Sequence, residues 1–255
     1  MTGSLYYKTK PDFLKKQSQL AVNLKNYNAL VNNFSFFHCW QAYLLPDFCQ
    51  NCQRLGPMLC ESCYQLVEFF WQEDLAAFFA KNFDKNYFDQ IRVMARFKSP
   101  ISSLIKSLKY QHHSRAAKFL AQMLFFHLNI SYEKFDLITF VPIHNQKIKK
   151  RGYNQSQLIA EELAVWTKKP CLNLLKKTVN NTAQAQISDK QQRLQRLNNT
   201  FEISHPYSQH RPLKNKNILI IDDVITTGAT INSASRVLKK YGVEWVSVLT
   251  LAANL

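Results

Sequence analysis

The sequence predicts an α/β fold in which helices flank a parallel sheet, preceded by a small module that binds zinc through four cysteines. Short aliphatic runs at residues 137–141 and 218–221 have the length and composition of strands buried on both faces of a parallel sheet. Amphipathic segments at helical spacing follow these runs, which is the alternation that βα units require. Two Cys-x-x-Cys pairs lie ahead of the first run and have the spacing of zinc ligands.

The length and composition of the chain indicate one main domain and one small satellite. With 255 residues, of which 46% are hydrophobic, the chain is able to bury one substantial core. We expect an N-terminal segment of unknown function at residues 1–45, a cysteine module at residues 46–70 and the main domain at residues 85–255.

The chain is strongly basic, which bears on the kind of partner that it binds. It carries 33 Lys and Arg against 17 Asp and Glu, a formal net charge of +16, and this excess favours a polyanion. It has no run of eighteen apolar residues, and residues 1–20 mix lysines with polar side chains rather than forming a signal-peptide core. We therefore expect no stable membrane insertion and a cytoplasmic location.

The two Cys-x-x-Cys pairs predict a metal site. Cys49, Cys52, Cys60 and Cys63 lie within fifteen residues, and a Gly-Pro step turns the chain between the pairs. Each pair presents two thiolates from one tight turn, and two such turns complete the tetrahedral ligand set of a structural Zn²⁺. A redox pair and a coincidental spacing are the alternatives, although a cytosolic chain disfavours disulfides. Metal binding would order a segment that is too short to fold alone.

Two amphipathic helices are predicted after the cysteine module. Residues 101–108 place four aliphatic side chains on one helical face, and Pro100 suits the first turn of that helix. A second amphipathic stretch runs from about residue 116 to residue 128. Both have the periodicity of helices that pack one face against a core.

A dense basic segment follows the strand predicted at residues 137–141. Pro142 ends that strand, and the segment then supplies His144, Lys147, Lys149, Lys150 and Arg151 ahead of Gly152. A charge run is usually a solvated face, but this one leaves an apolar strand at the edge of the sheet where ligands bind. Asn154 then suits the N-cap of a further helix, so the segment lies beside a helix N-terminus, which favours anions.

The last strand–turn–helix unit carries the most informative residues. The aliphatic run at residues 218–221 delivers Asp222 and Asp223 directly into a hydroxyl-rich turn at residues 226–230, and a helical pattern follows. The N-terminus of that helix offers unpaired N–H groups to a phosphate. The two acids only accept hydrogen bonds, so they suit a ribose diol and a divalent cation. A further strand is predicted at residues 245–251, which gives the sheet at least three parallel members.

This unit resembles, position by position, the ribose-phosphate signature of type I phosphoribosyltransferases. The resemblance implies that 5-phosphoribosyl 1-pyrophosphate (PRPP) binds here with Mg²⁺. It makes Asp222 and Asp223 the catalytic acids and assigns PRPP binding to Thr226, Thr227, Gly228, Ala229 and Thr230. A simpler interpretation, a buried strand followed by a polar turn, leaves the adjacent acids unexplained. Some purine-salvage members carry an acid where Thr226 stands, so no purine specificity is implied.

The basic segment gains a role from this resemblance. A pyrophosphate leaving group needs cations, and a mobile cationic loop is able to close over it and exclude water. We therefore expect a pyrophosphate loop that contains His144, Lys147, Lys150 and Arg151. His144 either contacts the pyrophosphate or caps the loop.

The order of motifs along the chain is similar to that of the ComF family of phosphoribosyltransferase-like proteins. The cysteine pairs are followed by Leu-Lys-Tyr at 108–110, Val-Pro-Ile-His at 141–144, Arg-Gly-Tyr-Asn-Gln at 151–155 and the paired acids. Two positions depart from the family pattern: Arg196 stands where an Asn is expected, and Asn181 where a Thr is expected. The resemblance covers roughly residues 46–253. It implies natural transformation, with single-stranded DNA and competence or DNA-processing proteins as partners.

Two functions from different classes remain open at this point. One is a phosphoribosyltransferase enzyme that transfers the sugar from PRPP to an unidentified acceptor and releases pyrophosphate. The other is a competence factor that handles incoming single-stranded DNA, with charge and aromatic side chains suited to that ligand. A basic stripe continuing through Lys106, Lys109, Arg115 and Lys118 would favour DNA.

Overall fold

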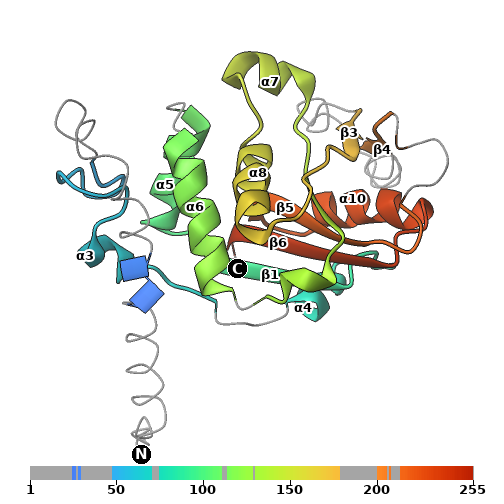
Figure 1. Ribbon diagram of the computed structural model, residues 1–255, viewed down its shortest axis with the longest axis horizontal. Coiled ribbons are helices and arrows are strands. Elements are labelled where there is room, and N and C mark those ends of the chain that lie inside the picture. Colours follow the sequence, from blue (N-terminus) through green and yellow to red (C-terminus); the bar gives the residue numbers. More distant parts are fainter. Residues whose placement is uncertain are drawn as a thin grey trace, which may run out of the picture. The chain divides into compact units, whose positions relative to one another are not determined.

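The chain divides into two compact units, residues 1–66 and 67–255. The computed structural model describes residues 25–26, 28–29, 48–70, 75–110, 114–128, 130–178, 200–205, 207 and 213–254 (Figure 1). Most of the predicted N-terminal segment therefore lies outside the described residues, as do Asn181 and Arg196.

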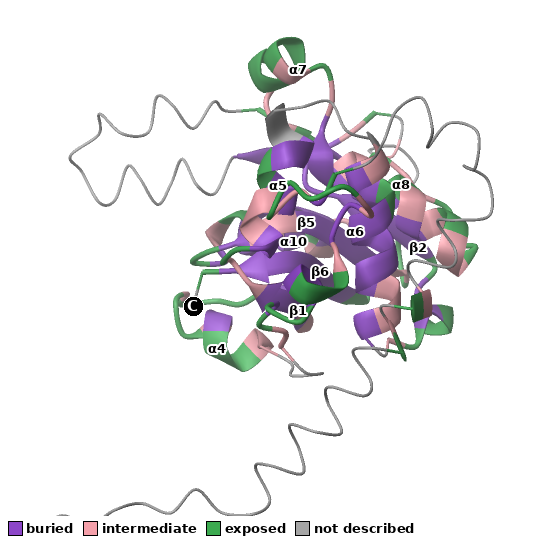
Figure 2. Cartoon of the chain, turned by 90° about the vertical axis from the view of Figure 1, so that its left-hand side faces the viewer, coloured by how far each residue is buried: buried purple, intermediate pink, exposed green. Residues whose placement is uncertain are grey.

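The second unit is built on a four-stranded, fully parallel sheet, which confirms the predicted fold class. Its order is β1 (Gln90–Arg96), β6 (Trp245–Ala253), β5 (Asn217–Ile225) and β2 (Leu137–Phe140). Strand β6 is buried at all but its first residue and β5 through most of its length, and both strands are largely purple in Figure 2. This double-sided burial explains their aliphatic sequences, because both faces of a parallel sheet are covered.

Helices cover both faces of this sheet. On one face, α8 (Gln155–Thr167) packs against β2 and β5, and α6 (Ser114–His127) packs against α8 and against α5 (Ile101–Tyr110). On the other face, α10 (Ala229–Lys240) shares one buried apolar cluster with alternate residues of β5 and β6. The predicted helices at 101–108 and 116–128 are thus confirmed within one or two residues.

A short antiparallel pair extends this second face. β3 (Leu175–Lys177) pairs with β4 (Phe201–Ile203), and Leu175, Phe201 and Ile203 join the apolar cluster of α10. Helix α4 (Ala76–Ala80) contributes Phe79 to the same cluster. The 3-10 turn η1 (Tyr132–Lys134) precedes β2. Residues 68–70 lie along β1, since Phe70 N–H donates to Met94 O at 2.9 Å.

The first unit holds the cysteine module. Its described part contains the short helix α3 (Glu61–Tyr64), and Met58, Leu59 and Tyr64 are buried. No helix among the residues described in either unit has the length and apolarity needed to cross a membrane.

Candidate functional site

The paired acids lie on the central strand of the sheet, close to its carboxyl end. The strand was predicted to end at residue 221, but β5 continues to Ile225 and carries both acids. Asp222 is 7% exposed, and its Oδ1 accepts hydrogen bonds from Ser156 Oγ at 3.1 Å and from the Asp223 N–H at 2.9 Å. Asp223 is half-buried, and its Oδ1 accepts from the Val224 N–H at 2.8 Å. These bonds fix the two carboxylates at the edge where parallel sheets bind ligands.

The hydroxyl-rich turn leads from β5 into α10. Thr226, Thr227 and Thr230 are exposed, and Ala229 is half-buried. Gly228 is the N-cap of α10 with φ 82°, a left-handed conformation that favours glycine. A Cβ atom at this position would lie 3.3 Å from Phe79 Cδ1, so close packing also favours glycine here. The turn therefore brings hydroxyls and the N–H groups of a twelve-residue helix to the same edge as the acids.

A segment that the sequence patterns did not single out supports the turn. Asn82 Nδ2 donates to the Thr227 carbonyl at 3.0 Å, and Phe79 and Phe83 pack against Gly228. Asn232, on the first turns of α10, accepts from the Tyr87 N–H at 2.9 Å and donates to the Lys85 carbonyl at 3.0 Å. A polar Asn232 among buried positions of an amphipathic helix was the available signal for this support.

The basic segment forms a helix rather than the predicted mobile loop. Helix α7 (Asn145–Arg151) begins at His144, whose Nδ1 accepts from the Gln146 N–H at 3.3 Å, and ends at Gly152 with φ 84°. The prediction of a loop overlooked that Gln, Lys and Arg are good helix formers and that the segment has a cap at each end. Of the two roles considered for His144, capping is the one that the structure shows: its side chain caps the N-terminus of α7.

The Arg-Gly-Tyr-Asn-Gln segment connects three elements around the acids. Asn154 is the N-cap of α8, as predicted: its Oδ1 accepts from the Ser156 N–H at 3.2 Å. Its Nδ2 donates to the Val141 carbonyl at 2.9 Å, at the end of β2. Ser156, two residues further along, donates to Asp222. Tyr153 donates its hydroxyl to the Leu108 carbonyl of α5. Ser156, the residue that follows the segment, thus positions Asp222, a contact that sequence spacing did not reveal.

A lysine from β3 joins the same site. Burial lowers the pKa of Lys177, the nearby charge of Lys147 lowers it further, and the charge of Asp222 raises it. The ammonium group of Lys177 lies 5.5 Å from the centroid of the Phe201 ring, and the charges of Lys147 on α7 and Asp222 on β5 act on its pKa in opposite directions. Lys177 lies on a three-residue strand with no distinctive sequence pattern, so sequence reasoning missed it.

The other predicted cations are more exposed. Lys147, Lys149 and Lys150 are exposed on α7, and Arg151 is half-buried at its end. Lys106 and Lys118 are exposed on α5 and α6, Arg115 is half-buried on α6, and the Lys109 side chain lies outside the described residues. The continuity of a stripe across these helices thus stays a prediction.

The four module cysteines gather at one point in the first unit. Their Sγ atoms all lie within 4.8 Å of one another, and the Cys52 and Cys60 sulfurs are 3.7 Å apart. Tetrahedral zinc with Zn–S distances of about 2.3 Å has S–S edges of about 3.8 Å, so the cluster fits a structural metal ion such as zinc. The Cys60 N–H donates to Cys49 Sγ at 3.4 Å, and Asn51 Nδ2 donates to Cys63 Sγ at 3.3 Å.

The pKa values of two of these thiols move in opposite directions. Burial by itself raises the pKa of Cys49, but the backbone N–H groups of Cys52, Cys60 and Asn51 outweigh burial and lower the pKa to about 6. Burial raises the pKa of Cys63 to about 12, and the neighbouring cysteines add to the rise. A metal ion binds cysteine as the thiolate, so a cation at the centre of the cluster would favour the charged form of all four side chains.

Comparison with known proteins places this site in context. Residues 148–255, which contain the acids, the turn and α10, match the phosphoribosyl transferase domain family. The chain is 30% identical over 169 residues to competence protein F of Haemophilus influenzae, covering 64% of this chain and 72% of that protein. It is 26% identical over 167 residues to the DNA utilization protein YhgH of Escherichia coli, covering 64% and 71% respectively. It is 29% identical over 110 residues to competence protein ComFC of Bacillus subtilis, covering 43% and 41%.

Proposed function

Because this chain belongs to the ComF family, we propose that it acts in DNA uptake and natural transformation by handling incoming single-stranded DNA, and that its phosphoribosyltransferase-like domain binds PRPP with Mg²⁺. The relatives are named for competence and for DNA utilization, which supports the first part. The incoming strand would be met in the cytoplasm, together with competence or DNA-processing proteins.

The observation that carries the PRPP proposal is the buried acid beside a helix N-terminus. Asp222 is held by Ser156 at the end of β5, and only six positions later Gly228 opens α10 in a left-handed conformation. An anion at this N-terminus and a diol or cation at the acids together match one ligand, a sugar phosphate with bound metal. We propose that Thr226 to Thr230 hold the 5-phosphate and that Asp222 and Asp223 hold the ribose diol and Mg²⁺.

The pyrophosphate group would lie against cations from two elements. Lys147, Lys150 and Arg151 come from α7, and Lys177 comes from β3. Lys177 is already partly desolvated, and a buried ammonium gains more from an anion than an exposed one does. We therefore propose that Lys177 contributes more to PRPP affinity than any single exposed lysine of α7.

Lys177→Met should weaken PRPP binding about tenfold or more, because a charge-assisted contact to phosphate is worth about 1.5–3 kcal/mol. Lys176→Met is the matched control: it removes the same charge from the neighbouring residue, whose exposed side chain alternates to the other side of β3. Titration calorimetry with PRPP and Mg²⁺ measures both. Equal affinities for the two variants would remove Lys177 from the pyrophosphate site.

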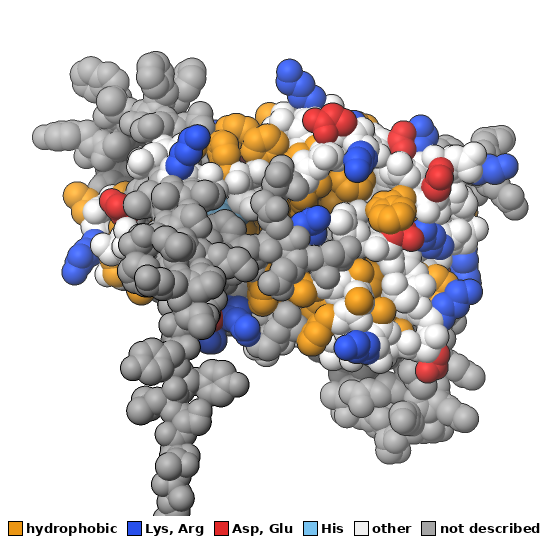
Figure 3. Space-filling model, turned by 90° about the horizontal axis from the view of Figure 1, so that it is seen from below, with side chains coloured by type: hydrophobic (Ala, Val, Ile, Leu, Met, Phe, Trp, Pro, Cys, Tyr) orange, Lys and Arg blue, Asp and Glu red, His pale blue; other side chains and the backbone are white. Residues whose placement is uncertain are grey.

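The DNA proposal rests on the net charge of +16 and on family membership. On the coloured part of the face drawn in Figure 3, Lys and Arg side chains lie scattered between hydrophobic patches and a few acids. Single-strand binding uses cations for the phosphates and aromatic side chains for the bases, and 13% of the residues of this basic chain are aromatic.

Binding to single-stranded DNA should weaken as salt rises. Each phosphate that the protein neutralises contributes about −0.7 to the slope of log affinity against log salt concentration. Fluorescence anisotropy with a labelled oligothymidylate over a series of salt concentrations measures this slope. A flat response, or no binding at low salt, would contradict the electrostatic proposal.

The alternative function is enzymatic, and the match of residues 148–255 to the phosphoribosyl transferase domain family supports it. In this reaction the bond from C1 of ribose to pyrophosphate breaks and a bond from C1 to an acceptor forms, while the cations stabilise the departing charge. Release of pyrophosphate when the protein is incubated with PRPP, Mg²⁺ and candidate acceptors tests it. Binding of PRPP without pyrophosphate release would favour the role of PRPP as a bound ligand.

A further inference from the structure

A cationic pocket lies away from the acids, along the later part of α10. Its volume is about 520 Å³, within the range of small-ligand sites, and residues 85–89 form one wall while Arg236, Lys239 and Lys240 form the other. Asp89 directly precedes β1. It accepts a hydrogen bond from the Val246 N–H, at the start of β6. The pocket is therefore near the amino ends of these strands, whereas the acids lie at the carboxyl end of β5.

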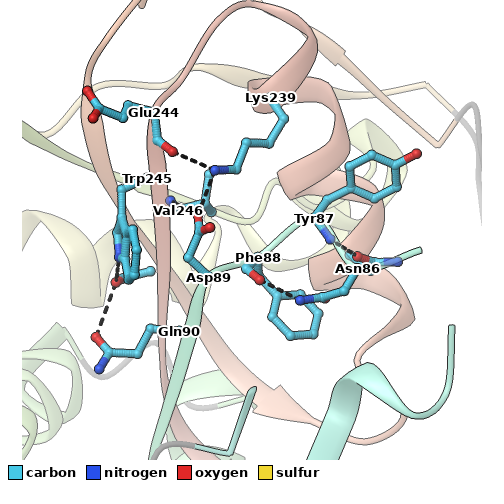
Figure 4. A network of polar contacts seen from close by, with 11 residues as sticks. Asn86, Tyr87, Phe88, Asp89, Gln90, Lys239, Glu244, Trp245 and Val246 are labelled. Atoms are coloured by element: carbon cyan, nitrogen blue, oxygen red, sulfur yellow. Dashed lines mark hydrogen bonds and ion pairs between the residues drawn. The ribbon is translucent and has the colours of Figure 1, made fainter. Parts of the chain in front are cut away.

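One of its lysines is committed to the structure of the pocket. Lys239 Nζ lies 2.7 Å from Asp89 Oδ2 and donates to the Glu244 carbonyl at 2.6 Å (Figure 4). Asp89 Oδ2 also accepts from the Val246 N–H at 2.7 Å. The Lys239–Asp89 ion pair thus connects α10 to the start of β1 and β6. Asp89 is the one acid among the residues that line the pocket, and it already has these partners.

The other three cationic residues that line the pocket are not paired with an acid among the residues that the structure describes. Among the residues that the structure describes, Lys85, Arg236 and Lys240 form no ion pair, and Arg236 Nε is buried without a hydrogen-bond partner. A buried donor without a partner is costly, and an anion in the pocket would give Arg236 Nε that partner. Lys85 and Lys240 are exposed and add positive charge to the lining of the pocket.

An aromatic ring lies beside these cations. Tyr87 lines the pocket, is half-buried, and has Lys85 Nζ 5.3 Å from its ring centroid. Its backbone is held in place because the Tyr87 N–H donates to Asn232 on α10. A rigid ring next to several cations is the arrangement that single-strand binding proteins use, with a base on the ring and the phosphate on the cations.

We propose that this pocket binds one nucleotide unit of single-stranded DNA, with its phosphate between Arg236 and Lys240 and its base against Tyr87. The proposal rests on the DNA-handling part of the proposed function and gives it a location separate from the PRPP site. Lys85, over the Tyr87 ring, adds a cation for the adjoining phosphate of the strand.

The test uses the full chain and a labelled oligothymidylate in fluorescence anisotropy. Arg236→Gln with Lys240→Gln should make the salt dependence less steep by about 0.7 for each phosphate that the variant no longer neutralises. Tyr87→Leu should weaken binding at least about fivefold, because stacking of one base is worth about 1–3 kcal/mol, whereas Tyr87→Phe should keep wild-type affinity. Lys134→Gln removes an exposed charge that does not line this pocket, and should have little effect.

The outcomes separate this proposal from the proposed function. Loss of DNA binding in the Arg236 and Tyr87 variants, with PRPP titration and the thermal unfolding midpoint unchanged, supports the pocket. If all pocket variants bind DNA as the wild type does, the proposal that this pocket binds the strand is wrong, while the proposed function is unaffected. A wild type that binds no strand overturns both. If the variants lose binding of free thymidine monophosphate but keep the strand, the ligand is a free nucleotide and the strand proposal is wrong.

Discussion

Asp222→Asn combined with Asp223→Asn should abolish PRPP binding in the presence of Mg²⁺ while the fold is retained. Asp222 and Asp223 are successive residues of β5, so two like charges lie near the carboxyl end of one strand and disfavour each other's ionisation. Neighbouring acids at one end of a strand therefore stay ionised most easily when a cation binds them or the hydroxyls of a diol donate hydrogen bonds to them. Asparagine has nearly the same volume, and its carbonyl oxygen is still able to accept the hydrogen bond that Ser156 now donates to Asp222.

Titration calorimetry with PRPP and Mg²⁺, alongside thermal unfolding, measures this result. Asp136→Asn is a suitable control, because Asp136 lies just ahead of β2 and interacts with Lys216 and the Asn217 N–H, at the other end of β5. Hydrogen bonds from the Asn217 N–H and Lys216 lower the pKa of Asp136, so its ionised carboxylate stabilises the fold at pH values above that pKa. Asp136→Asn should therefore lower the stability of the protein at neutral pH and leave its PRPP affinity unchanged. Wild-type affinity in the double variant would mean that Asp222 and Asp223 are structural.

A single substitution in the turn tests the contribution of the turn to PRPP affinity apart from that of the acids. Thr227→Val removes a hydroxyl that accepts from the Ala229 N–H at 3.4 Å, but it leaves the N–H groups of α10 in place. PRPP affinity should therefore fall only in part, because the backbone donors and the dipole of the helix still attract the phosphate.

The parts of the fold that could be predicted from sequence are those with local patterns. The aliphatic runs of β2, β5 and β6 are buried on both faces, so each is recognisable on its own. Strand β1 is different: it lies at the edge of the sheet and carries Arg92 and Arg96, which interrupt its apolar pattern. Its membership of the sheet follows from pairing with β6, more than 150 residues away, and no local pattern contains that information.

The candidate site divides in the same way. Asp222, Asp223 and the turn at Gly228 lie in one continuous segment, so a single motif contains them. Ser156 donates to Asp222 from α8, and Lys177 lies on β3, so the place of both residues depends on how these elements pack. Asn82 supports the turn from 145 residues away in the sequence. Position in three dimensions, rather than residue type, makes these residues part of the site.

Replacing Cys49 and Cys52 together by serine should remove the bound metal from the first unit. The four sulfurs lie within 4.8 Å of one another, which fits a structural zinc site, and serine is a far poorer ligand for this metal than a thiolate. Metal analysis of the purified wild type should find one zinc per chain, and the double variant should have none. Cys171→Ser is the matched control, because Cys171 lies outside the cluster in the second unit.

Loss of the metal should also disorder the first unit without unfolding the second. The described part of the cysteine module buries only a few large apolar side chains, including Met58, Leu59 and Tyr64, while structural zinc contributes about 10–16 kcal/mol apparent to folding. Limited proteolysis should therefore cut the double variant within residues 48–66 and leave the parallel sheet of the second unit protected. Zinc affinity should fall as pH falls, because protons compete for the thiolates. A wild type that is fully folded and protected without any metal would show that the four cysteines are not a metal site.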